Sequence, residues 1–185
     1  GKGVLSAEKV IQFPTRVNTE IFYPKNKGNC RELLKLDKNE ILITTTGRLN
    51  KLKGWEFMLD CFSEFNKIYN NSKFVFIGDG EDRNKIEKKI IYMKLESKVS
   101  IAGRVNHDKL SQYLGASNLY IMGSYVEGWA TSLVEAIASG IPVCVTDFSS
   151  ASDLVENGLN GYIIKDHNKA KFVKSMIDCL NLSEN

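Results

Sequence analysis

The stretch NLYIMGSYVEGWATSLVEAIASGIPVCV, residues 118–145, decides the fold class of this chain. It opens with an apolar run typical of a buried strand, passes through a loop, and shows helical spacing over residues 131–138. It closes on a second apolar run at residues 141–145. A strand, a helix and a strand in this order predict parallel pairing, because the helix carries the chain back over a sheet face before the next strand starts.

The same alternation extends over most of the chain. Strands are expected at residues 41–45, 74–77, 99–102, 118–122, 141–145 and 161–164. Helices are expected at residues 54–69, 81–93, 107–114, 131–138, 150–156 and 168–180. We therefore predict an α/β fold with a six-stranded parallel sheet covered by helices on both faces, which explains why the strands read as nearly continuous apolar runs.

Length and composition indicate one soluble globular domain. The chain has 185 residues, of which 43% are hydrophobic and 25% charged, and it has no apolar run approaching the ~20 residues that span a bilayer. The 25 basic and 22 acidic side chains give a formal charge of +3, too even a balance to indicate nucleic-acid binding. No secretory signal is recognised, so the cytoplasm is the expected compartment.

Cysteine and histidine spacing argues against a metal site. The chain has no CxxC pair, and its two histidines, His107 and His167, lie apart from its cysteines in the sequence. We expect buried free thiols and no bound metal. The four cysteines are Cys30, Cys61, Cys144 and Cys179.

The two ends of the chain do not follow the repeat. Residues 2–29 carry Pro14 and Pro24 between apolar residues, which predicts an extended connector with one short strand. We assign residues 1–29 to an interdomain connector and the start of the domain, and residues 30–185 to the main domain. Residues 181–185 are polar and expected to fray.

The loop after the first strand, TGRLNKLKGW at residues 46–55, combines two cations with two glycines. Beside the N–H donors at the start of the next helix, Arg48 can hold two phosphate oxygens and Lys53 acts as a point charge. The segment predicts a phosphate site. An ordinary solvated loop is the alternative, since Lys and Arg are common in loops.

Glycines mark the second and third loops. Gly78 and Gly80 in IGDG permit a turn or a close approach, but the loop lacks the third glycine of a dinucleotide fingerprint and the chain has no P-loop pattern, which disfavours NAD and ATP sites. Gly103 in AGRV would let the main chain approach a flat ring. The next residue, Arg104, is equally consistent with a ligand contact and with an ordinary surface charge.

The fourth loop leads into the helix at residues 131–138. It contains Ser124, Tyr125, Glu127, Gly128 and Trp129. Either Thr131 or Ser132 could cap the helix, whose first amides would point into the same crevice as the cations of the first loop.

Two glutamates, Glu127 and Glu135, flank this helix start with seven residues between them. A loop carboxylate and a helical carboxylate would converge on one small polar ligand. Glu135 can accept hydrogen bonds from vicinal hydroxyls such as those of ribose, or it can complement the helix dipole.

Other candidate catalytic groups have weaker context. His107 is expected to cap a helix or to be exposed, because no partner for a general base is evident. Ser132 and Cys144 lack a nucleophile-elbow pattern, so covalent catalysis by them is not expected.

Taken together, five segments resemble the nucleotide-sugar-binding half of retaining glycosyltransferases with the GT-B fold, family 4 (glycosyl transferases group 1). They are GRLNKLKG (47–54), IGDG (77–80), AGRV (102–105), EGWATSLVEAIASGIPV (127–143) and ENGLNGYII (156–164). The resemblance spans about residues 41–164. FPTRVNTEIFYP, residues 13–24, also resembles the connector between the two halves of such enzymes.

The resemblance implies a Rossmann-like, doubly wound C-terminal domain that binds a UDP- or GDP-sugar, with the acceptor held by an N-terminal domain absent from this chain. Arg48 and Lys53 would hold the diphosphate, Glu135 the ribose hydroxyls, and Glu127 would lie beside the transferred sugar. The implied catalytic residues are Glu127, Arg48 and Lys53. The implied nucleotide-sugar contacts are Gly47, Arg48, Lys53, Gly78, Gly80, Gly103, Arg104, Val105, Ser124, Glu127, Gly128, Trp129, Ala130, Thr131, Ser132 and Glu135.

In such enzymes backbone groups near Arg104 and Val105 would meet the base, cations stabilise the phosphate leaving group without a metal, and the new bond keeps the donor's anomeric configuration. This chain departs from the family pattern. Gly123 replaces a proline that usually precedes the serine, and Trp129 and Ala130 replace the commoner Phe and Gly of an EGFG-type loop.

The implied function is donor binding for a hexosyltransferase-like enzyme of polysaccharide, lipopolysaccharide or glycolipid synthesis. Its acceptor would be a glycan or a lipid-linked glycan, and the full protein would lie in the cytoplasm or at the inner face of the membrane. The isolated chain is expected to be inactive. A nucleotide-sugar epimerase of the same architecture and a non-catalytic nucleotide-sugar-binding module are the alternatives.

Overall fold

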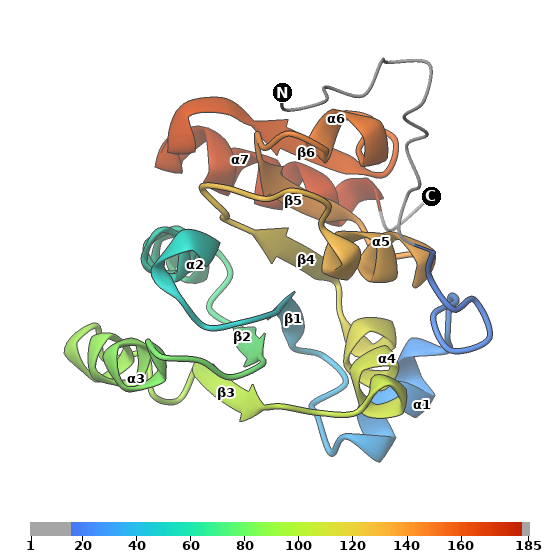
Figure 1. The fold of residues 1–185 in the computed structure, drawn as a ribbon. Helices are drawn as coiled ribbons and strands as arrows, with labels where there is room; N and C mark the ends of the chain where they lie inside the picture. The colour runs from blue at the N-terminus through green and yellow to red at the C-terminus, as the bar shows by residue number, and fades with distance from the viewer. Residues whose placement is uncertain (1–15, 183–185) are drawn as a thin grey trace, which may run out of the picture.

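A computed structural model of the chain describes residues 16–182. Its sheet has six strands, all parallel, in the order β3-β2-β1-β4-β5-β6 (Figure 1). This confirms the predicted α/β architecture. The elements in chain order are α1 (Lys27–Leu33), β1 (Ile41–Thr46), η2 (Lys51–Lys53), α2 (Trp55–Ile68), β2 (Ser72–Ile77), α3 (Arg83–Tyr92), β3 (Val99–Gly103), α4 (His107–Ala116), β4 (Leu119–Met122), α5 (Thr131–Ala138), β5 (Val143–Thr146), α6 (Ala151–Leu154), β6 (Gly161–Ile164), η3 (Lys165–His167) and α7 (Lys169–Leu182).

The strands form where the apolar runs predicted them, with small shifts at their ends. Every residue of β4 and β5 is buried, as expected for central strands of a parallel sheet. β5 begins at Val143 rather than at residue 141, after Pro142, which has no N–H to donate to a neighbouring strand. α6 is shorter than predicted because the backbone of Val155 is already extended.

Helices α2, α3 and α7 pack on one face of the sheet (Figure 1). α2 is amphipathic: Met58, Leu59, Phe62 and Phe65 recur at helical spacing and are buried against the sheet. Burying a phenylalanine side chain contributes about 1.5–3 kcal/mol, so this stripe fixes the rotation of α2 and hence the direction of the loop that enters it.

Helices α1, α4, α5 and α6 pack on the other face, together with part of the N-terminal segment. Phe22 is 2% exposed in this second core. The hydroxyl of Ser111 in α4 donates to the Ile21 carbonyl at 2.6 Å. The segment around residues 21–22 is therefore packed onto the domain.

The N-terminal prediction needs correction where the structure describes it. Residues 16–26 contain no strand, and α1, which was not predicted, begins at Lys27 with Asn26 as its cap. α1 is held by Arg31, a residue only 4% exposed, whose Nε donates to the Ala116 carbonyl at 3.0 Å and whose Nη2 donates to Asn118 Oδ1 at 2.6 Å. The rest of the predicted connector strand, residues 2–15, and the end of the predicted frayed tail, residues 183–185, lie outside the described residues. α7 continues through the start of that tail to Leu182.

The strand order places a topological switch point between β1 and β4, where the chain winds outward in opposite directions. Ligands of open α/β sheets bind at such points, beyond the carboxyl ends of the strands. The loops that follow β1 and β4 touch here: a Cβ built on Gly54, at φ +66°, would lie 1.8 Å from the Gly123 carbonyl oxygen. Glycine at position 54 therefore allows the two loops to meet.

Two further predictions concern the cysteines and the membrane. All four cysteines are buried free thiols, as predicted. Within residues 16–182, no helix combines the length and apolar character needed to cross a membrane.

Candidate functional site

A cleft of about 590 Å³ lies at the carboxyl edge of the sheet. Its walls come from the ends of β1, β2 and β3 and from the first turns of α4 and α5. The residues that line it are Thr46, Gly47, Arg48, Ile77, Gly78, Asp79, Arg104, Val105, His107, Leu110, Thr131, Ser132 and Glu135.

The cleft brings together half of the predicted site. Arg48 from the β1 loop and Glu135 from α5 line the same cavity, although they lie far apart in the sequence. The predicted residues in the lining are Gly47, Arg48, Gly78, Arg104, Val105, Thr131, Ser132 and Glu135. The predicted residues outside the lining are Lys53, Gly80, Gly103, Ser124, Glu127, Gly128, Trp129 and Ala130.

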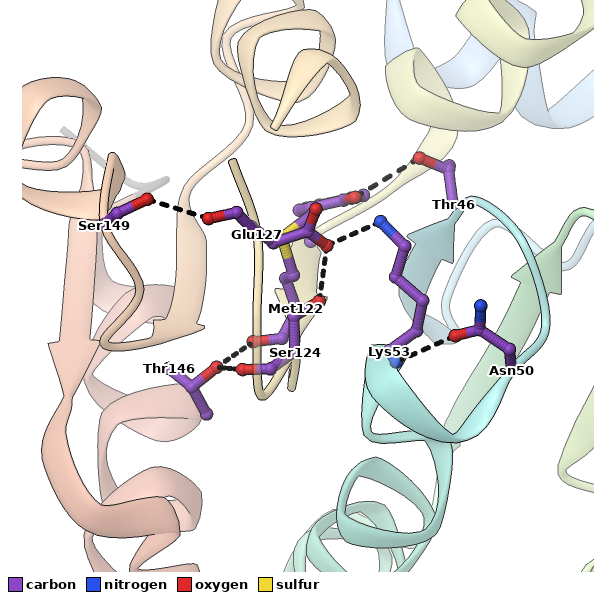
Figure 2. Close-up of polar contacts among 9 residues, drawn as sticks. Thr46, Asn50, Lys53, Met122, Ser124, Glu127, Thr146 and Ser149 are labelled. Atoms are coloured by element: carbon purple, nitrogen blue, oxygen red, sulfur yellow. Dashed lines mark hydrogen bonds and ion pairs between the residues drawn. The ribbon is translucent and has the colours of Figure 1, made fainter. Parts of the chain in front are cut away.

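A second polar group, Lys53 with Glu127 and Ser124, lies at the switch point (Figure 2). Lys53 Nζ is 2.5 Å from Glu127 Oε1, and Ser124 Oγ donates to the same oxygen at 2.7 Å. A Cβ built on Gly47, which lines the cleft, would lie 3.9 Å from Lys53 Nζ. The ion pair therefore borders the cleft on the β1 side.

The backbone around Glu127 is anchored by hydroxyl groups from the end of β5 and from the loop after it (Figure 2). Thr146 Oγ1 donates to the Ser124 carbonyl at 2.7 Å, and Ser149 Oγ donates to the Glu127 carbonyl at 2.7 Å and to the Gly128 carbonyl at 3.2 Å. These bonds satisfy loop carbonyls that no strand partner reaches. They hold the stretch of backbone that carries Glu127.

Arg48 is an accessible cation in the wall of the cleft. Its side chain is 70% exposed, and its Nε donates to Glu81 Oε2 at 3.0 Å. The pKa of Glu81 is lowered, first by a hydrogen bond from its own backbone N–H and then by Arg48. Exposed pairs of this kind contribute little to stability, so the guanidinium can exchange Glu81 for another anion at little cost.

Glu135 is half-buried in the wall of the cleft. Burial raises the pKa of this carboxyl above its usual range, and the nearby His107 partly opposes the shift. Tyr120, which is fully buried, has its hydroxyl 3.2 Å from Oγ1 of the cleft residue Thr46. Such a partly desolvated carboxylate gains from hydroxyl donors that enter the cleft.

The start of α5 differs from the prediction. Neither Thr131 nor Ser132 is the N-cap; that position is Ala130, which makes no side-chain capping bond. Ala130 is 3% exposed and belongs to the second core, and its φ of −84° is ordinary for a residue with a Cβ. The alanine that replaces the family glycine thus packs inward, and the helix end beside the cleft keeps backbone donors without a capping side chain.

The predicted glycines serve mainly to pack one loop on the next. A Cβ on Gly78, at φ +146°, would lie 1.9 Å from the Gly47 carbonyl oxygen, and a Cβ on Gly80 would lie 2.4 Å from the Leu49 carbonyl oxygen. Gly103 has φ +74°, and its carbonyl accepts from the Gly78 N–H at 2.9 Å. Gly78 does permit a close approach of backbone, as predicted. The group that approaches it in the structure is the Gly47 carbonyl of the neighbouring loop.

Four residues that line the cavity were not predicted as site residues. Thr46, Ile77 and Asp79 lie inside the quoted segments TGRLNKLKGW and IGDG but were given no role, and Leu110 lies outside every quoted segment. Their positions at or next to the carboxyl ends of strands, or one turn into α4, were the available signal. His107 is exposed, as predicted, but its position in the cleft wall was missed, and the cap of α4 is Asn106, whose side chain accepts from Lys109 N at 2.9 Å.

The arrangement suits a ligand with an anionic centre and a hydroxylated arm. Cations from one loop face the start of a helix, and a carboxylate lies one turn into that helix. Within residues 16–182, no three His, Cys, Asp or Glu side chains cluster as metal ligands.

The chain is similar in sequence to known glycosyltransferases. A profile described as glycosyl transferases group 1 matches residues 26–185. The Escherichia coli UDP-Gal:alpha-D-GlcNAc-diphosphoundecaprenol alpha-1,3-galactosyltransferase is 28% identical over 174 residues, covering 91% of this chain and 44% of the relative. The chain spans less than half the length of the first curated relatives it matches.

Solved structures agree on the fold. Sucrose-phosphate synthase from Thermosynechococcus elongatus superimposes with a TM-score of 0.81 at 22% identity, covering 89% of this chain and 42% of that one. The C-terminal domain of a glycosyl transferase group 1 family protein from Francisella tularensis gives a TM-score of 0.80 at 21% identity, covering 91% of this chain and 90% of that one. The sheet is that of a Rossmann-like domain of the GT-B fold, and the chain belongs to the glycosyl transferases group 1 family.

Proposed function

We propose that this chain is the C-terminal, donor-binding domain of a retaining family 4 glycosyltransferase, and that its cleft holds a nucleoside-diphosphate sugar. One observation carries the proposal: Arg48 and Glu135, which come from opposite sides of the switch point, line a single cavity, and the Lys53–Glu127 pair borders it. One ligand in this cleft could therefore contact both basic and acidic side chains.

The cations act on the leaving group. As the glycosidic bond breaks, negative charge grows on the donor diphosphate, and Arg48 and Lys53 are positioned to stabilise it. Arg48 can bind two oxygens at once, whereas Lys53 supplies a point charge. Backbone donors at the start of α5 add to the same field. In this mechanism the cations do the work that a metal does in other transferases.

The carboxylates act on hydroxyl groups. Glu135, which lines the cleft, would accept hydrogen bonds from the ribose diol, and Glu127, whose ion pair with Lys53 borders the cleft, would meet the transferred sugar. The backbone at Arg104 and Val105 lines the far wall, where the base would lie. Transfer with retention of the anomeric configuration completes the proposal.

The nucleotide is a uridine or guanosine diphosphate. Uridine has additional support, since the name of the E. coli relative specifies UDP-Gal as the donor. The acceptor would bind to a second domain that closes on this one and excludes water, so the isolated chain should bind the donor and scarcely turn it over.

Calorimetry with the 185-residue chain tests the donor site. We expect heat of binding for UDP or GDP, and tighter binding for the corresponding nucleotide sugar. Arg48→Ala should weaken binding, while Lys174→Ala, which removes a lysine from an exposed pair on α7, should leave it unchanged. A folded chain that binds neither nucleotide would contradict the proposal.

Product analysis on a longer protein that includes an acceptor domain tests the reaction. Transfer of the sugar to an acceptor with the donor's anomeric configuration supports the proposal. Inversion of a stereocentre within the donor would instead identify an epimerase, and binding without any reaction would identify a non-catalytic module.

A further inference from the structure

We propose that His167 is a positioning residue that holds residues 123–127 in the orientation needed to bind the transferred sugar. His167 lies after β6, outside every segment that the sequence singled out for chemistry. The inference rests on the proposed function, because it gives this segment its role through Glu127.

His167 contacts the segment in two ways. Its Nε2 lies 3.1 Å from the Gly123 carbonyl oxygen, and since a carbonyl can only accept, Nε2 carries the proton. Its ring stacks on Tyr125, with centroids 4.1 Å apart and planes 9° apart. Phe57 of α2 also contacts the imidazole, in a T-shaped arrangement with ring centroids 5.0 Å apart. The imidazole is therefore held between α2 and the loop after β4.

The backbone at this position is strained. Asp166 has φ +63° and His167 has φ +44°, the left-handed region that residues with a Cβ rarely adopt. Two consecutive non-glycine residues in this region persist where surrounding contacts overdetermine them. Here those contacts are the stack and the hydrogen bond that His167 makes with the loop.

The contacts that His167 makes are linked to Glu127 through Ser124. Gly123 and Tyr125, the residues of the segment that His167 contacts, flank Ser124, whose hydroxyl donates to Glu127 Oε1 at 2.7 Å (Figure 2). The Tyr125 N–H also donates to the Leu52 carbonyl at 2.9 Å, which joins the segment to the loop that carries Lys53. Holding residues 123 and 125 thus sets the direction of both partners of the Lys53–Glu127 pair.

Thr146 and Ser149 hold the same segment, but only through its carbonyl oxygens. His167 differs because its ring also stacks on a side chain of the segment, that of Tyr125, which is 50% exposed. Without the imidazole, the bonds from Thr146 and Ser149 should still hold residues 123–127 to the domain, but the orientation of the segment should no longer be fixed. Binding of the sugar should suffer while binding of the nucleotide, held by other loops, should not.

The test compares nucleotide and nucleotide-sugar affinities by calorimetry on the 185-residue chain. The probes are UDP, UDP-glucose, UDP-galactose, UDP-N-acetylglucosamine, GDP and GDP-mannose. The variants are His167→Asn, which tolerates the left-handed backbone, and His167→Gln, which keeps an amide donor for Gly123. Tyr92→Leu is the matched control, since Tyr92 is 83% exposed on α3, which precedes β3, whereas His167 follows β6 at the other end of the strand order.

We expect His167→Asn to weaken the best nucleotide sugar by about tenfold while changing the parent nucleotide by less than about threefold. His167→Gln should fall between His167→Asn and the parent chain, and Tyr92→Leu should match the parent. Equal losses for nucleotide and nucleotide sugar, or no loss for either, would overturn the inference. So would a parent chain that gains nothing from any of the sugars. Absence of nucleotide binding in the parent chain would instead reject the proposed function.

A spectroscopic readout separates positioning from folding. With 5-fluorotryptophan incorporated, the ¹⁹F spectrum reports Trp129, beside Gly128 in the loop, separately from Trp55 in α2. In His167→Asn the Trp129 resonance should shift or broaden while that of Trp55 stays in place. An unchanged Trp129 resonance, or equal changes in both, would also overturn the inference.

Discussion

Lys53 Nζ lies 2.5 Å from Glu127 Oε1 and so joins the loop after β1 to the loop after β4 across the switch point of the sheet. The two side chains are 29% and 11% exposed. At this degree of burial solvent and salt screen the pair less than they screen a surface ion pair. The two charges proposed to act on the donor therefore also hold the site together.

A double-mutant cycle should reveal this coupling. Lys53→Met leaves the Glu127 carboxylate shielded from water without its cation, so we expect it to lower the free energy of unfolding by about 2 kcal/mol. Adding Glu127→Gln should restore part of the loss, giving a coupling of about 1–2 kcal/mol in urea denaturation. Simple additivity of the two substitutions would mean that the pair contributes nothing.

Arg48 should matter for ligand binding and hardly at all for stability. Because its side chain is 70% exposed, Arg48→Ala should change the free energy of unfolding by less than about 0.5 kcal/mol. Loss of a charge-assisted contact should weaken UDP or GDP binding by about 1.5–3 kcal/mol in calorimetry. Lys174→Ala is the control on α7, and a nucleotide affinity that is the same in both variants would count against Arg48 as a phosphate ligand.

Glu135 should show opposite effects on stability and on binding. Burial raises the pKa of the Glu135 carboxyl in the folded chain. Its ionisation therefore lowers the free energy of unfolding at pH values above the folded-state pKa. Below the unfolded-state pKa the carboxyl is protonated in both states, and this loss of stability is absent. Glu135→Gln should therefore raise the melting temperature at neutral pH and lose that advantage in acid. Differential scanning calorimetry across pH 4–8 checks this expectation.

Binding by Glu135 needs its ionised form. The nucleotide affinity of the parent chain should fall with decreasing pH, with a midpoint above the value of about 4.3 that is usual for glutamate. Glu135→Gln should bind more weakly at neutral pH and lack this transition. Parallel pH profiles for the two proteins would show that Glu135 does not meet the ligand.

The contact between Gly54 and Gly123 should tolerate no side chain at position 54. Gly54→Ala places a Cβ 1.8 Å from the Gly123 carbonyl oxygen and imposes a left-handed backbone on alanine, so we expect a loss of about 3 kcal/mol or more. Gly128→Ala is the matched control, because a Cβ there has nothing within 4 Å. Thermal unfolding of the two variants measures the difference, and equal melting temperatures would refute the contact.

Much of the fold was predictable because buried parallel strands and amphipathic helices leave clear patterns. α5 has the predicted bounds, and each of the six predicted strands is present. α1 was missed because it is short and its stabilising contacts come from Arg31 to residues far along the chain. A seven-residue helix gains little from local propensity, so its presence depends on tertiary packing.

The candidate site was predictable where charged residues follow strands, as at Arg48 and Glu135, because parallel strands bring their carboxyl ends to one edge. The direction of each side chain was not. That Lys53 turns to Glu127 and Arg48 to Glu81 depends on loop geometry, which sequence spacing does not specify. His167 was missed for the same reason: its partners are a carbonyl and a ring on a distant loop.

Because the strands are parallel and the cleft lies at their carboxyl ends, the edge of the sheet at their amino ends takes no part in it. Exposed residues there, such as Glu96 and Ser97 before β3, offer attachment points for a fluorophore or a surface tether. A chain immobilised through that edge would present its cleft to the bulk solution, which suits optical sensing of sugar nucleotides.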